Sequence, residues 1–137
     1  MTYQTIINQE LNEHKYTNGG TKTVCVSTCL NFFGIRPSEY HYTSSNNNIY
    51  SYKNVLRRFG YSVRSRRSMF KIKKSPTMTS VKRMMRKSDY TQNDYFIVSG
   101  CQSRKAHLMV MNGNGEIIID TAPNSRWKVR DISIVER

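Results

Sequence analysis

The carboxy-terminal part of the chain is a series of strand-like segments joined by short turns. These segments are Tyr95–Val98, Ala106–Met111, Glu116–Ile119 and Lys128–Val135. The turn Asn112-Gly113-Asn114-Gly115 separates the middle two, and Asn-Gly pairs favour tight hairpins. Because a tight turn reverses the chain, strands joined in this way pair antiparallel. The pattern predicts a mostly antiparallel carboxy-terminal sheet.

Helical segments precede this sheet. Cys25, Cys29, Phe32 and Phe33 follow a helical period, and Gly34 is placed to end that helix. Further helices are predicted from Ile49 to Phe59, before Gly60, and from Thr77 to Lys87, after Pro76, with short strands at Tyr61–Val63 and Met69–Lys73. This order predicts an α+β fold in which the amino-terminal helix that carries Cys25 packs on the sheet.

The length of the chain limits its organisation. A chain of 137 residues buries one moderate core, so we expect a single domain over residues 1–137. No segment approaches the ~18 apolar residues of a membrane span, and Met1-Thr2-Tyr3-Gln4 does not begin a signal peptide. We expect a cytoplasmic protein without membrane contact. Its oligomeric state cannot be read from the sequence.

The cysteines favour reduced thiols. The chain has three, without a Cys-x-x-Cys pair, so a disulfide scaffold is not indicated. Cys25 and Cys29 could chelate a metal with His14 or His41, but no second ligand pair is present, and we expect neither a metal nor another cofactor. Cys29 and Cys101 are interpreted as packing residues.

Cys25, His107 and Asp120 have the residue types and the chain order of a cysteine nucleophile site. A thiol at a helix amino terminus beside an imidazolium has a lowered pKa, so it reacts as thiolate. His107 would then donate its proton to the leaving group, and Asp120 would hold the other ring nitrogen. The alternative is structural, because free cysteines are commonly buried and a lone histidine at a strand start usually has no catalytic role.

Several local patterns are shared with a known family. They are the Cys-x-x-x-small-Leu helix at Cys25, the segment Leu56-Arg57-Arg58-Phe59-Gly60-Tyr61, the strand that begins near His107, and Gly115-x-Ile117-Ile118-Ile119-Asp120-Thr121. Over roughly residues 18 to 122 the chain resembles papain-like cysteine peptidases, especially small bacterial and phage members and the peptidase domains of bacteriocin exporters. The resemblance implies a papain-like fold, a peptide or protein substrate, Cys25 as nucleophile, His107 as general base and acid, and Asp120 as orienting group.

The chain departs from that family before the cysteine. Members usually carry a Gln or Asn there, whose amide helps to bind the oxyanion, but Gly19 stands six positions before Cys25, and Asn18 is the candidate donor. Loss of such a donor costs about 2.7 to 4 kcal/mol, so a slow or inactive enzyme stays open. Asn124, in an Asn-Ser-x-Trp segment similar to that of papain, is the alternative to Asp120, which we favour because it falls at a strand end. Trp127 is interpreted as a core or rim aromatic.

Basic residues are concentrated between positions 53 and 87. The net charge is +13, and this segment holds thirteen basic residues and no acidic one. They are Lys53, Arg57, Arg58, Arg64, Arg66, Arg67, Lys71, Lys73, Lys74, Lys82, Arg83, Arg86 and Lys87. Such a block attracts nucleic acid or an acidic protein, and Tyr61 and Phe70 could stack on bases. A solvated basic face is the alternative.

Three functions follow from these features. The first is a papain-like cysteine peptidase or an amide or thioester hydrolase. The others are a catalytically inactive papain-like scaffold and a basic protein that binds nucleic acid or an acidic host protein. The small size, the Asn-, Lys- and Tyr-rich composition and the basic excess suggest a phage or mobile-element product, which would act in the host cytoplasm or be carried in the virion.

Overall fold

A five-stranded sheet forms the centre of the molecule. The computed structural model describes residues 16–18, 21–23, 25–36, 39, 52–102, 105–120 and 126–137. The strands of the sheet are β3 (Ser62–Ser65), β4 (Tyr95–Gln102), β5 (Lys105–Asn112), β6 (Ile117–Ile119) and β7 (Lys128–Glu136). Their order is β3-β7-β4-β5-β6, and every neighbouring pair is antiparallel. The predicted antiparallel sheet is confirmed.

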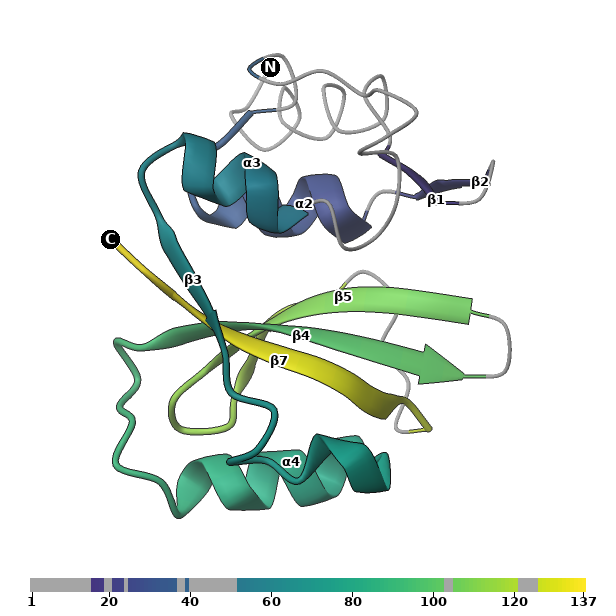
Figure 1. Cartoon of the computed structure of the whole chain (residues 1–137), viewed down its shortest axis with the longest axis vertical. Coiled ribbons are helices and arrows are strands. Elements are labelled where there is room, and N and C mark those ends of the chain that lie inside the picture. The colour runs from purple at the N-terminus through teal and green to yellow at the C-terminus, as the bar shows by residue number, and fades with distance from the viewer. Residues whose placement is uncertain are drawn as a thin grey trace.

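Helices cover both faces of this sheet (Figure 1). The helices α2 (Cys25–Phe32) and α3 (Tyr52–Arg58) lie on one face, and α4 (Met78–Arg86) lies on the other. The α+β class and the packing of the Cys25 helix on the sheet are therefore confirmed. None of the helices in the described part of the chain is long and apolar enough to cross a membrane.

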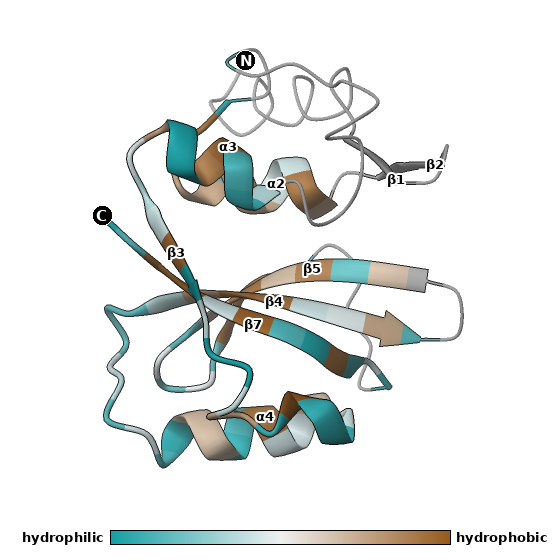
Figure 2. Cartoon of the chain, viewed as in Figure 1, coloured by the Kyte–Doolittle hydropathy of each residue, from teal (hydrophilic) through white to brown (hydrophobic). Residues whose placement is uncertain are grey.

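The sheet separates two apolar cores. Leu108 and Val110 of β5 pack with α2 and α3, whereas Met109 and Met111 of the same strand pack with α4. Successive side chains of a strand point to opposite faces, so a strand buried on both faces is apolar throughout rather than alternating. Figure 2 shows the hydrophobic residues of α4 on the side that faces the sheet. This two-sided burial holds β5 firmly between the helical layers.

Glycines end the two helices of the first layer. Gly60 follows α3 with φ of +91°, and the next residue, Tyr61, donates its backbone N–H to the carbonyl of Leu56. This is the Schellman arrangement, in which a left-handed residue lets the chain satisfy the last helical carbonyls. Gly34 ends α2 in the same way, with Ile35 bonded to Leu30. The hydroxyl of Tyr61 also donates to the carbonyl of Phe33 at 2.6 Å, which joins the two helix ends.

One extra residue in β7 changes which face its side chains occupy. Asp131 pairs with Ser99 and Val129 pairs with Gly100, so Arg130 has no partner in β4 and forms a β-bulge. Without the bulge, Val129 and Asp131 would share a face. With it, Val129 packs in the α4 core, while Asp131 reaches Lys53 of α3.

One expectation for local structure is wrong. Residues Met69–Lys73 form no strand, because η2 (Ile72–Lys74) is a 3-10 turn flanked by Lys71 and Ser75 in the left-handed region. Their alternation arises because Phe70 and Ile72 are buried in the α4 core as anchors of that turn.

A short hairpin precedes α2. It consists of β1 (Tyr16–Asn18) and β2 (Thr21–Thr23), which pair antiparallel. His14, His41 and Asn124 lie outside the described residues.

The helix-ending role of Gly60 can be tested by substitution. A Cβ at Gly60 would meet no atom within 4 Å, so Gly60→Ala introduces backbone strain without a clash. We expect it to lower the free energy of unfolding by about 1–2 kcal/mol, because a left-handed residue with a Cβ is disfavoured. Gly60→Asn should lose clearly less, since Asn tolerates this conformation. Urea unfolding measures both values, and equal losses would contradict the role of backbone conformation.

Candidate active site

The structure brings Cys25, His107 and Asp120 together. Cys25 is the first residue of α2 and is buried, with 3% of its surface exposed. His107 lies near the start of β5, and Asp120 directly follows β6. The helix α2 packs against both strands, and the hydrogen bond between Cys25 and His107 places the helix start beside the imidazole. Three segments that are distant in the sequence therefore meet at one end of the helix–sheet contact.

A hydrogen bond joins His107 to Asp120. The Nε2 atom of His107 lies 2.5 Å from Oδ1 of Asp120, and the two side chains are only 5% and 12% exposed. The pairing of Val110 with Ile119 across β5 and β6 places Asp120 within reach of His107. A carboxylate at this position favours the imidazole tautomer that carries its proton on Nε2, and it stabilises the imidazolium.

His107 also forms a hydrogen bond with Cys25. Since Nε2 is engaged by Asp120, Nδ1 is the ring nitrogen left for the thiol. Burial of the imidazole is the largest single influence on its pKa and lowers it, but the hydrogen bonds to Cys25 and Asp120 and the charges of both groups together raise the pKa of His107 above 6.5. These contacts shift the imidazole toward its protonated form, which is the form that can stabilise a neighbouring thiolate.

Trp127 covers the imidazole. Its ring stacks on that of His107, with centroids 5.1 Å apart and an interplanar angle of 24°. Gly100, which pairs with His107, leaves room for the indole, because a Cβ at position 100 would make a tight contact of 3.2 Å with Cβ of Trp127. Trp127 is buried, as expected for a core aromatic, but its contact with His107 was not foreseen. In the sequence, the only signal for this contact was the Asn-Ser-x-Trp segment that resembles papain.

The other cysteines differ from Cys25. Cys29, one turn further along α2, is fully buried, and its burial and the negative charges of Cys25 and Asp120 raise its pKa well above 9.0. Cys101 lies in β4, is partly exposed and pairs with Ala106. None of the three forms a disulfide. Within the described residues no group of His, Cys, Asp and Glu is arranged to hold a metal ion.

The candidate oxyanion donors lie at the start of α2. As the first helical residue, Cys25 presents its backbone N–H at the positive end of the helix. Asn18 ends β1, which contacts α2, and it pairs with Thr21 across the hairpin.

The basic segment does not form one surface. Its α3 residues and its α4 residues lie on opposite sides of the sheet, and Arg64, Arg66, Arg67, Lys71, Lys73 and Lys74 lie between them in β3 and the following turns (Figure 1). Some of its charges are engaged locally, such as Arg64 with Glu136 at 3.2 Å.

The aromatic residues proposed to stack on bases are engaged elsewhere. Phe70 is fully buried in the α4 core. The ring of Tyr61 packs edge-on against Phe33, and the guanidinium of Arg137 lies 4.9 Å from its centroid. The expectation that Phe70 stacks on bases is therefore wrong, because its side chain anchors the turn before α4.

The raised pKa of His107 predicts its titration. Followed by NMR, the imidazole should titrate with a midpoint above 6.5, and both Asp120→Asn and Cys25→Ala should lower this midpoint, because burial then opposes the charge with less compensation. The favoured imidazolium stabilises the fold fully below the unfolded pKa of about 6.5, and this contribution is lost as pH rises through the folded pKa. A wild-type midpoint below 6.5 would contradict the described contacts.

Comparisons with known proteins do not place the chain in a family. No protein-family model matches it, and searches of curated proteins and of solved structures found no similar protein. Its chemistry is therefore inferred from the contacts of Cys25, His107 and Asp120 themselves.

Proposed function

We propose that the chain is a cysteine-dependent hydrolase of the papain-like type, acting on an amide or thioester bond of a peptide or protein. The observation that carries the proposal is the continuous series of hydrogen bonds from Cys25 through His107 to Asp120. The three residues depend on one another, because a thiol nucleophile needs a base and the base needs a group that orients it. The order of the three residues in the chain and the resemblance to papain-like peptidases support the same assignment.

The reaction follows from the positions of the protons. The Cys25 thiolate attacks the carbonyl carbon of the substrate and forms a C–S bond, while the carbonyl oxygen takes up the negative charge. His107 then gives its proton to the leaving amine or thiol as the scissile bond breaks. A water molecule attacks the resulting thioester, His107 takes a proton from that water, and the carboxylic acid leaves from Cys25. Asp120 keeps the imidazole oriented through both steps.

The oxyanion would be held at the start of α2. The backbone N–H of Cys25 and the helix dipole favour negative charge there, and Asn18 of the adjacent β1 is the proposed second donor. The absence of the family's Gln or Asn at the sixth position before Cys25 is what keeps an inactive scaffold as the competing function.

Thiol labelling tests the proposal without a known substrate. A thiol of ordinary pKa is only about 1% thiolate at pH 6.5, so an ion pair with His107 should make Cys25 react with iodoacetamide up to ~100-fold faster than an ordinary thiol. Cys29 and the partly exposed Cys101 serve as internal controls. Mass spectrometry of labelled peptides at pH 6 to 7 gives the three rates.

Variants separate the alternatives. His107→Ala should remove the advantage of Cys25, and Asp120→Asn should reduce it. Equal labelling of Cys25 and Cys101 in the wild-type protein would reject the hydrolase and favour the inactive scaffold.

A further inference from the structure

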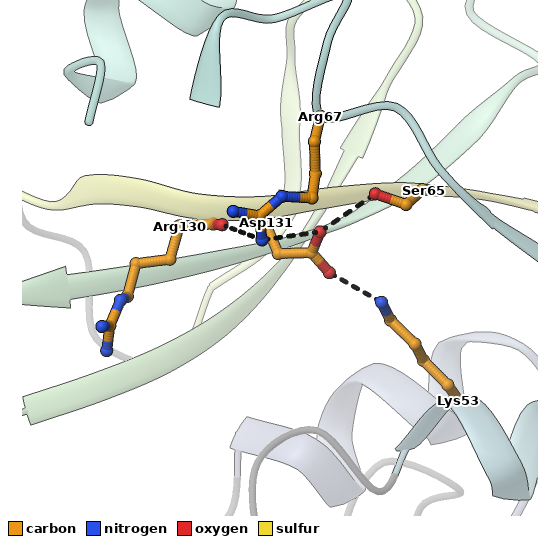
Figure 3. Close-up of a pocket in the computed structure, with 5 residues that line it drawn as sticks. All are labelled: Lys53, Ser65, Arg67, Arg130 and Asp131. Atoms are coloured by element: carbon orange, nitrogen blue, oxygen red, sulfur yellow. Dashed lines mark hydrogen bonds and ion pairs between the residues drawn. The ribbon is translucent and has the colours of Figure 1, made fainter. Parts of the chain in front are cut away.

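A polar cavity opens between α3 and the β3–β7 side of the sheet. It has a volume of about 470 Å³ and is lined by Lys53, Ser65, Arg67, Arg130 and Asp131 (Figure 3). Lys53 comes from α3 and points toward Asp131 of β7. The β-bulge at Arg130 brings the Asp131 carboxylate to this side, so the cavity depends on that bulge.

Asp131 orders the cations around the cavity. Its side chain is only 5% exposed, and its Oδ2 lies 2.8 Å from Nζ of Lys53. Nη1 of Arg67 lies 3.9 Å from Oδ1, and Ser65 donates a hydrogen bond to that oxygen at 3.3 Å. A buried carboxylate needs such partners. Asp131 thereby fixes the positions of the ammonium and guanidinium groups.

The cavity nevertheless has an excess of positive charge. Lys53, Arg67 and Arg130 line it against a single carboxylate. The Arg67 side chain is 55% exposed. Its Nη1 lies near the Asp131 carboxylate and donates a hydrogen bond to the carbonyl of Arg130. A guanidinium has five N–H donors, so the donors on its other nitrogens point elsewhere. An anionic group entering the cavity would therefore find donors that Asp131 does not saturate.

Arg67 also lines a second cavity. This one has a volume of about 500 Å³ and is lined by Arg67, Ser68, Lys71, Ile72, Lys73 and Lys74, without an acidic residue. We call the two cavities that share Arg67 the Arg67 groove. A ligand lying along the groove would need several anionic groups to pair with Arg67 and the three lysines. A single small anion needs fewer cationic partners than this.

We infer that the Arg67 groove binds an acidic segment of a polypeptide. Nucleic acid is disfavoured because single strands bind through aromatic side chains stacked on bases. The large hydrophobic residues exposed in the described part of the chain are Met69 and Ile118, neither of which is aromatic.

Peptide binding tests the groove without requiring catalysis. The probe is a fluorescein-labelled hexaglutamate peptide, measured by fluorescence anisotropy with the Cys25→Ala protein. Removal of two groove charges in Lys73→Gln/Lys74→Gln should weaken binding about tenfold. This variant leaves Asp131 and its partners intact, and Arg67→Gln/Lys71→Gln should have a similar effect.

The matched control removes two charges elsewhere. Arg83→Gln/Arg86→Gln on α4, across the sheet from α3, should leave binding almost unchanged. Equal weakening by the groove and α4 variants would overturn the inference, because it would show only the general field of a chain with net charge +13. Tighter binding of a thymidine oligonucleotide through the same groove residues would also overturn it.

Discussion

The pairing of β5 with β6 holds His107 and Asp120 at hydrogen-bonding distance, and the candidate site depends on this pairing. An imidazole buried without a partner would favour its neutral form, because burial alone lowers its pKa. Asp120 and Cys25 reverse that preference. Because a single edge strand positions the carboxylate, the charge state of the site is linked to the register of the sheet.

Burial of β5 on both faces explains how His107 is held in its position relative to Asp120. Leu108 and Val110 pack under the α2 layer while Met109 and Met111 pack on α4, so β5 cannot slip by one residue without exchanging its two sets of side chains. His107 shares that strand and inherits its fixed register. The helix that carries Cys25 packs on the same strand, so β5 positions both Cys25 and His107.

Much of the architecture could be predicted because it follows from local patterns. Periodicity located α2, α3 and α4 to within a few residues, and residue type and chain order selected Cys25, His107 and Asp120. Asp131 was missed because its position depends on the bulge at Arg130, which strict alternation does not reveal. The buried anchors Phe70 and Ile72 imitated a strand because a turn packed on a core can bury alternate residues too.

Trp127 connects the two layers of the molecule. It stacks on His107, and its carbonyl accepts the backbone N–H of Met78, the first residue of α4. Two residues further along the chain, the backbone N–H of Val129 donates to the carbonyl of Pro76, so β7 is also bonded to the residues just before α4. The far helical layer is thus mechanically coupled to the imidazole. A displacement of the first turn of α4 would therefore act on the indole that stacks on His107, although α4 and the helix of Cys25 lie on opposite faces of the sheet.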